Sequence, residues 1–191
     1  MKNRIITISR EFGSGGRTIG KKVAEKLNIP CYDSELIEKI ALESGFSEEY
    51  VKEIEENSRG RFLSLFSNRA YAPNNEDIIW KIQCKVILDL AEKGPCVIVG
   101  RCADYVLREK ADFLKVFIHA DKKFRAERIV NVYGETDVSV EQRIKEKDKR
   151  RAAYHRFYTD KKWGDARNYD VALDSGVIGL DKCVEIVKSL F

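Results

Sequence analysis

The sequence predicts a doubly wound α/β fold, in which helices cover both faces of a parallel sheet. A short β-branched run at residues 5–8 leads through a glycine-rich turn into a helical pattern. Residues 96–99 form an uninterrupted apolar run, typical of a strand buried on both faces of a parallel sheet. Predicted strands and helices alternate along the chain, and right-handed crossovers are expected between them. Ligands of such folds bind at the carboxyl ends of the strands.

The first strand, turn and helix, at residues 4–27, have the arrangement of a phosphate-binding site. Glycines let backbone N–H groups converge on an anion, and the helix N-terminus adds partial positive charge. Gly16-Arg17-Thr18 matches the end of the P-loop pattern G-x-x-x-x-G-K-[ST] with arginine for lysine, while Glu11 stands at its first glycine. A simple connecting turn is the alternative, but it would not need three glycines. The predicted phosphate-binding residues are Gly13, Ser14, Gly15, Gly16, Arg17 and Thr18.

Composition narrows the class of protein and of ligand. The 191 residues are most simply one domain, and 43% hydrophobic with 35% charged residues is usual for soluble globular proteins. A net charge of +4 suits an anionic small molecule in a basic cleft and does not favour nucleic acid. Neither a membrane span nor a signal peptide is expected. Five scattered cysteines without a CxxC pattern argue against disulfides and zinc, so the expected compartment is the cytoplasm.

A very short strand at residues 31–32 and two helices follow the first helix. Asp33 is predicted to N-cap the first of these helices, which Gly45 ends. Ser47 and the two glutamates after it begin the second helix. Residues 57–75 are polar, then aromatic, then turn-rich, and this segment is predicted to be an acceptor-side flap or a partner surface.

The middle of the chain supplies two more helices and two more strands, each bounded by turn or capping residues. Neither His119 nor His155 is given a catalytic role, because neither has a local partner motif. The predicted elements are a helix at 76–93, strands at 96–99 and 113–119, and a helix from the N-cap Asp121 to near Gly134.

A long helix is predicted from Ser139 to about Lys161, within a lid-like segment at 139–163. Its apolar stripe thins after Ile144, so we expect that the helix is not firmly anchored along its length. A solvated helix and a mobile basic lid over phosphates are equally good interpretations of this pattern alone. The residues on its basic face, at spacings i, i+3, i+4 and i+7, are Lys147, Arg150, Arg151 and Tyr154.

The last predicted strand, at residues 169–173, precedes a C-terminal helix. In this fold the phosphate loop, Asp33-Ser34, Arg101 and the start of the lid-like helix all lie near the carboxyl ends of strands. They come from four separate regions of the chain but are all anion-handling groups. Their convergence predicts one anion-binding site.

Several motifs resemble the cytidylate kinase-like branch of the P-loop nucleoside monophosphate kinases. They are ISREFGSGGRTIGKKVAEKL, CYDSELI, VIVGRCADYVL followed by LKVFIHA, and NYDVALDSGVIGLDKCVEIV, and together they run over nearly the whole chain. The resemblance implies one domain over residues 1–191 with a three-layer P-loop NTPase fold, a five-stranded parallel sheet and a helical lid. It also implies ATP with Mg²⁺ as the phosphoryl donor and CMP or dCMP as the acceptor.

The resemblance also implies roles for individual residues. The loop at residues 13–18 would hold the donor phosphates, with the Thr18 hydroxyl near Mg²⁺. Asp33 and Ser34 match the start of the acceptor side, and Arg101 matches the arginine that clamps the acceptor phosphate. Lys147, Asp148 and Arg150 match the Arg-Asp-x-Arg pattern of the lid. The implied catalytic residues are therefore Arg17, Arg101, Lys147 and Arg150.

The chain departs from the family pattern at three places. Gly16, rather than Arg17, falls on the P-loop lysine when the flanking strand and helix are aligned. The family's Gly-Arg-Asp becomes Gly-Arg-Cys at residues 100–102, which leaves Asp104 as a substitute carboxylate. In the lid, an aspartate and an arginine are replaced. The implied substrate-binding residues are Asp33, Ser34, Arg101, Asp104, Arg151 and Tyr154.

The expected function is therefore an ATP-dependent nucleoside monophosphate kinase with a small-molecule nucleotide substrate. A P-loop kinase for another small acceptor and a nucleotide-binding regulator without turnover are the alternatives. Neither nucleic acid nor a membrane is an expected partner, and the sequence leaves a homo-oligomer open.

Overall fold

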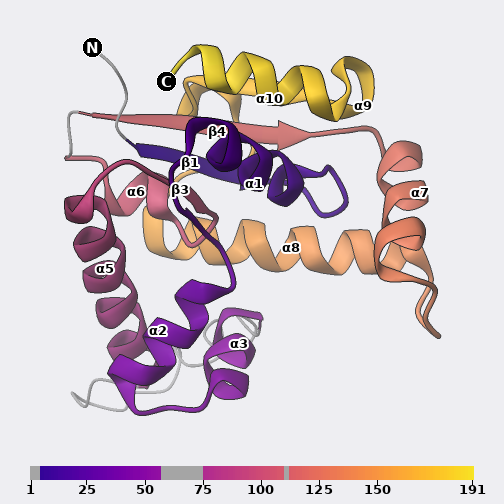
Figure 1. Cartoon of the computed structure of the whole chain (residues 1–191). Helices are drawn as coiled ribbons and strands as arrows, with labels where there is room; N and C mark the ends of the chain where they lie inside the picture. The colour runs from indigo at the N-terminus through magenta and orange to yellow at the C-terminus, as the bar shows by residue number, and fades with distance from the viewer. Residues whose placement is uncertain (1–4, 57–74, 110–111) are drawn as a thin grey trace.

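The computed structural model describes residues 5–56, 75–109 and 112–191. Within them, five strands form one parallel sheet in the order β2-β3-β1-β4-β5 (Figure 1). This confirms the predicted five-stranded parallel sheet. The last strand begins two residues later than expected, because Tyr169 ends a short 3-10 helix and packs against Phe117 instead. The strands are β1 (Ile5–Arg10), β2 (Cys31–Tyr32), β3 (Cys96–Val99), β4 (Phe113–His119) and β5 (Val171–Asp174).

Helices alternate with these strands in the predicted order. The C-terminal helix is divided at Gly179, which separates a first turn from the main helix. The helices are α1 (Gly16–Leu27), α2 (Glu35–Ser44), α3 (Glu48–Glu56), α5 (Asn75–Lys93), α6 (Ala103–Val106), α7 (Lys122–Tyr133), α8 (Val140–Thr159), η1 (Ala166–Asn168), α9 (Ser175–Ile178) and α10 (Leu180–Ser189).

The sheet is the middle of three layers, and its alternating side chains build two apolar cores. Ile6 and Ile8 of β1 pack with residues of α1 and α10 on one face. Ile5 belongs to the core on the other face, with residues of α2 and α5. In Figure 1, α9 and α10 lie above the sheet, and α2, α3, α5 and α8 lie below it. Burial on both faces explains why β3 is an uninterrupted apolar run.

Several predicted helix ends are confirmed by their capping geometry. The Asp121 carboxylate accepts a hydrogen bond from the Phe124 N–H at 2.9 Å and begins α7. Gly45 ends α2 with a φ of 73°, in the left-handed region that glycine adopts without strain. The prediction that Asp33 caps α2 is wrong, because Ser34 holds the N-cap position and Asp33 forms ion pairs with arginines instead.

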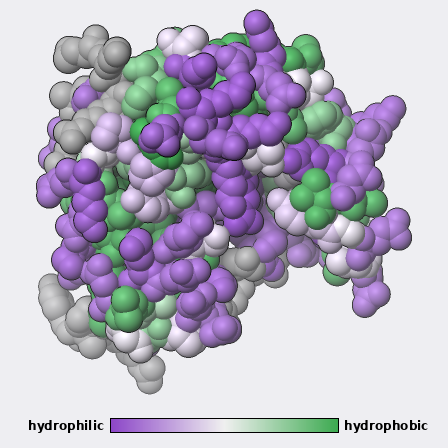
Figure 2. All heavy atoms as spheres, viewed as in Figure 1, coloured by the Kyte–Doolittle hydropathy of each residue, from purple (hydrophilic) through white to green (hydrophobic). Residues whose placement is uncertain are grey.

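The predicted flap at residues 57–75 lies outside the described residues except for Asn75, with which α5 begins. None of the helices that the structure describes is both long enough and apolar enough to cross a membrane. The face seen in Figure 2 carries mostly hydrophilic residues, with apolar patches between them.

Candidate active site

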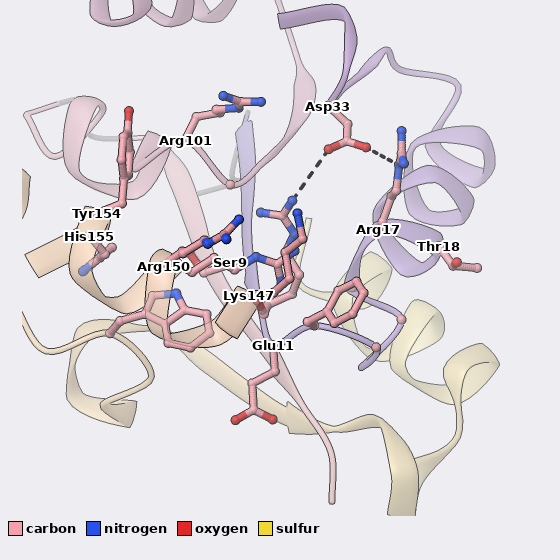
Figure 3. A pocket seen from close by; sticks show the side chains of 18 of the residues that line it. Ser9, Glu11, Arg17, Thr18, Asp33, Arg101, Lys147, Arg150, Tyr154 and His155 are labelled. Carbon is pink, nitrogen blue, oxygen red and sulfur yellow. Dashed lines mark hydrogen bonds and ion pairs between the residues drawn. The ribbon is translucent and has the colours of Figure 1, made fainter. Parts of the chain in front are cut away.

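A pocket of about 380 Å³ opens where the first turn of α1, the carboxyl ends of β1 and β3, and the middle of α8 meet. Two carboxylates line it, those of Glu11 and Asp33. Figure 3 shows that Glu11 points away from the basic groups near Asp33 and Arg101. The excess of positive charge suits a ligand with several negative charges. The basic residues of its lining are Arg10, Arg17, Arg101, Arg128, Lys147, Arg150 and Arg151.

The loop between β1 and α1 is held in one shape by its glycines and by Ser14. Gly13 and Gly15 have φ values of 83° and 82°, and a Cβ on Gly13 would lie 2.8 Å from the Arg125 carbonyl oxygen. The buried Ser14 hydroxyl hydrogen-bonds the carbonyl oxygens of Glu11, at 2.9 Å, and Ile118, at 3.0 Å. The first N–H groups of α1 have no partner within the helix. The loop therefore presents backbone donors to the pocket, as a phosphate site requires.

Asp33 ties the start of α2 to the loop region. Its Oδ1 lies 3.8 Å from Arg10 Nη2, and its Oδ2 is paired with Arg17 Nε. Dashed lines in Figure 3 mark these two ion pairs. Arg17 Nη2 also donates a hydrogen bond to the Ser34 hydroxyl at 3.2 Å. Arg17 is thus directed toward Asp33 and Ser34, the two residues that the resemblance assigns to the acceptor side, rather than along the glycine-rich loop.

Thr18 is less well placed for its implied role beside Mg²⁺. Its hydroxyl accepts a hydrogen bond from Arg128 Nη2 at 2.7 Å, which puts a positive charge where a metal ion would have to lie. Figure 3 shows Thr18 on the far side of Arg17 from Asp33. The geometry therefore argues against Thr18 as a metal ligand.

Arg101 lies in an unusual backbone segment directly after β3. Gly100, Arg101 and Cys102 have consecutive φ values of 81°, 61° and 52°. Two of them are not glycine, and such strain is concentrated at functional sites. The Arg101 carbonyl accepts a hydrogen bond from Gln83 Nε2 at 3.1 Å. Burial lowers the pKa of the Arg101 guanidinium to about 10, so this group is cationic but poorly hydrated at neutral pH. A desolvated cation binds phosphate oxygens strongly.

Asp104 and Tyr154 make protein contacts that their implied roles did not anticipate. Asp104 is 9% exposed, its Oδ2 lies 3.2 Å from His155 Nε2, and it is not part of the pocket lining. It lies behind His155, so it is not in place to bind the substrate directly. The Tyr154 hydroxyl donates to Gln83 Oε1 at 3.2 Å, while the Tyr154 side chain lines the pocket.

The basic face of α8 lines the pocket, and the helix is not loosely attached. Asp148 accepts hydrogen bonds from Arg125 Nη1 at 2.5 Å and from the Phe12 N–H at 2.8 Å. Arg151 Nη1 donates to the Arg10 carbonyl oxygen at 3.0 Å. The expectation of weak anchoring is therefore wrong, because it counted only apolar contacts, and the contacts here are charged hydrogen bonds.

Three basic residues of the pocket were missed in the sequence. Arg10 was overlooked because the predicted strand stopped at Ile8, whereas β1 continues through Arg10. Arg128 lies on α7, where no motif distinguishes it from a surface arginine. His155 was given no role, yet it is 3% exposed and lines the pocket. Only Arg10 carried a usable signal, because it directly precedes the loop.

Comparison with known proteins places the chain in a family. The model of the cytidylate kinase-like family matches residues 5–177. A cytidylate kinase of Archaeoglobus fulgidus is 32% identical over 95% of this chain and 91% of its own length. A crystal structure of an uncharacterized protein from Eubacterium ventriosum has a TM-score of 0.73, with 32% identity over 97% of this chain and 96% of that one. Shikimate kinase from Bacteroides thetaiotaomicron shares the fold, at a TM-score of 0.54 and 16% identity over 97% of both chains. The chain therefore belongs to the cytidylate kinase-like family and is a phosphotransferase with a P-loop kinase fold.

Proposed function

We propose that the protein is an ATP-dependent nucleoside monophosphate kinase that transfers the γ-phosphoryl group of ATP to CMP or dCMP. One observation carries the proposal: seven basic side chains and a loop of backbone donors surround one pocket. A donor triphosphate and an acceptor monophosphate together bring more negative charge than most other ligand pairs. Family membership supports a nucleotide as the acceptor.

The donor phosphates would bind to the loop at residues 13–18 and to the first turn of α1. A Mg²⁺ ion bound with ATP would supply positive charge beside the donor phosphates. Of the two pocket carboxylates, Asp33 would hold such an ion only by exchanging the ion pair between its Oδ2 and Arg17 Nε for the metal, the same obstacle that Arg128 presents at Thr18. One carboxylate with substrate phosphates and water is a usual Mg²⁺ environment.

The acceptor phosphate would bind on the opposite wall of the pocket. Arg101 would supply a half-buried cation there, while Ser34 and Asp33 lie at the start of α2. Lys147 and Arg150 line the pocket from α8 (Figure 3) and would stabilise the charge of the transferring phosphoryl group. No general base is needed, because the acceptor phosphate is already ionised at neutral pH. Positioning and charge stabilisation are the main requirements of phosphoryl transfer.

The test is ADP formation from ATP with a panel of acceptors: CMP, dCMP, the other nucleoside monophosphates, and hydroxyl metabolites such as shikimate and gluconate. We expect CMP or dCMP to give the highest kcat/KM. Turnover of a non-nucleotide alone would assign the site to another acceptor. Arg101→Ala should lower kcat/KM for the acceptor by roughly 10²–10³-fold and leave the ATP dissociation constant nearly unchanged. Equal losses of both would remove Arg101 from the acceptor role.

A regulator that binds nucleotide without turnover is a second candidate, and one observation favours it. Gly16 stands where P-loop kinases carry the lysine that contacts the β- and γ-phosphates. Binding of ATP without ADP formation under any acceptor would support this alternative. Release of ADP that depends on a nucleoside monophosphate would exclude it.

A further inference from the structure

The missing P-loop lysine leaves open which side chain takes over its contact with phosphate. Residues 10–17 have the length of the pattern G-x-x-x-x-G-K-[ST], with Gly15 at the second glycine and Gly16 at the lysine. The structure supports this register, because α1 begins at Gly16, directly after Gly15 in the left-handed conformation. The first position of the pattern is then Arg10, the last residue of β1.

The side chain of Arg10 occupies the space into which a lysine at position 16 would grow. A Cβ built on Gly16 would lie 2.4 Å from Arg10 Cβ and 2.9 Å from Arg10 Cγ, far closer than two carbon atoms can approach. Position 16 therefore has to be a glycine as long as the Arg10 side chain follows this path. A lysine at position 16 and an arginine at position 10 would occupy the same space, so the chain can carry only one of them.

A second glycine makes room for the far end of the same side chain. A Cβ on Gly100 would lie 2.1 Å from Arg10 Nη1. The arginine thus runs from the end of β1, past the start of α1, to the turn that carries Arg101. Its Nη2 is 3.8 Å from Asp33 Oδ1, so the guanidinium lies between the phosphate loop and the acceptor-side residues. The transferring phosphoryl group has to pass through this region.

The guanidinium of Arg17 does not lie in this region between the loop and the turn that carries Arg101. Its Nε pairs with Asp33 and its Nη2 donates to Ser34, so its guanidinium is held at the start of α2. The Arg17 side chain is 45% exposed, whereas that of Arg10 is 22% exposed. Interactions between charges are stronger where water is excluded.

We propose that Arg10 is the phosphate-binding cation that takes the place of the P-loop lysine. Gly16 and Gly100 have no side chains and so leave the space that the Arg10 side chain needs to reach the phosphates. The inference rests on the proposed kinase function and corrects the assignment of this role to Arg17. An arginine suits the role because its planar guanidinium can donate to two phosphate oxygens at once and remains charged.

The experiment is a positional exchange, read first by calorimetric binding of Mg²⁺-free pyrophosphate and of ATP. Arg10→Gln should weaken both by roughly tenfold or more and should lower kcat/KM for ATP by about 10²–10³-fold. Gly16→Lys alone should lose a similar amount, because the lysine and Arg10 cannot share the space. The double variant Arg10→Gly with Gly16→Lys restores the first glycine and the lysine of the standard pattern, while Arg17 stays at its last position, so it should bind at least about tenfold better than Arg10→Gly alone.

Two further variants distinguish the inference from general loss of charge. Arg17→Gln should change pyrophosphate affinity by less than about threefold but raise KM for the acceptor, because Arg17 is held beside Asp33 and Ser34. Lys22→Gln, on the exposed side of α1 and outside the pocket lining, should match the wild type in every measurement. Thermal unfolding of each variant identifies those that fail to fold, and the exchange is then read from the variants that remain folded.

The outcomes separate this inference from the proposed function. If Arg17→Gln weakens pyrophosphate binding more than Arg10→Gln, or if the double variant binds no better than Arg10→Gly, the inference is overturned. A wild-type protein that binds pyrophosphate and ATP but phosphorylates no acceptor overturns the kinase function, while the ranking of the variants still decides the role of Arg10. A wild type that binds neither ligand overturns both.

Discussion

The buried ion pair between Arg125 and Asp148 should contribute measurably to the free energy of unfolding. Arg125 on α7 is 5% exposed, and its guanidinium contacts Asp148 of α8 and the Phe12 carbonyl oxygen of the phosphate loop, at 2.5 and 3.3 Å. Its Nε also lies 3.5 Å from Glu11 Oε2. One side chain therefore joins the loop, α7 and α8, and its loss should affect both the fold and the position of α8.

Arg125→Met keeps most of the aliphatic stem and removes the charge, leaving Asp148 partly buried without its cation. Removal of one member of a buried pair costs about 3–5 kcal/mol. The low end applies here, because the Asp148 side chain is still 18% exposed and keeps the hydrogen bond from the Phe12 N–H. For a domain of this size, about 3 kcal/mol corresponds to a fall in Tm of roughly 6–12 °C.

The assay is urea unfolding of the single variants and of the double variant Arg125→Met with Asp148→Leu. The double variant should recover part of the loss, because the partly buried Asp148 carboxylate is removed together with its cation, and the coupling free energy should be about 1–3 kcal/mol. Lys22→Met, which removes the exposed pair with Asp181, is the matched control and should leave the unfolding curve in place. The reasoning is refuted if Arg125→Met unfolds like the control, or if the losses of the two single variants simply add.

Three further predictions concern the pocket. Pyrophosphate at 100 times its dissociation constant should stabilise the protein by about 2.7 kcal/mol and raise Tm by roughly 5–11 °C. A rise in Tm no larger than that caused by chloride at equal ionic strength would argue against a polyanion site. Burial lowers the pKa of Arg151 to about 9 and that of Arg101 to about 10. Above about pH 9, anion binding should therefore be accompanied by proton uptake onto these arginines, and the affinity for the anion should fall as pH rises. Calorimetry that shows neither proton uptake nor a fall in affinity there would contradict this. Tyr154→Phe leaves the buried Gln83 Oε1 without its donor and should cost about 1–3 kcal/mol in urea unfolding, and an unchanged midpoint would mean that the bond is not formed in solution.

Most of the fold could be predicted from the sequence, because each element carries a local signal. The apolar run of β3 follows from burial on both faces, and Asp121 and Gly45 fit the capping positions where they are found. The prediction for Asp33 failed because a cap is a local interaction, whereas the partners of this carboxylate are Arg10 and Arg17, which lie on either side of the glycine-rich loop. Sequence proximity cannot reveal such partners.

The place of the basic pocket was also predictable, since its location follows from the topology of a parallel sheet. The contacts among the side chains of the pocket were not predictable. Whether Arg10 or Arg17 replaces a lysine depends on the direction of each side chain, and the signal lies in Gly16 and Gly100, which appear unrelated in the sequence. The attachment of α8 was missed for a similar reason, because Arg125 and Asp148 meet only in three dimensions.

A crystal structure of the protein with a non-hydrolysable ATP analogue, Mg²⁺ and CMP is the most direct test of the central claim that this pocket joins a donor and an acceptor phosphate. We expect the β- and γ-phosphates to lie on the amides of residues 13–18 with the Arg10 guanidinium beside them, and the CMP phosphate to contact Arg101. An analogue bound away from this loop, or a CMP phosphate with no contact to Arg101, would contradict the account.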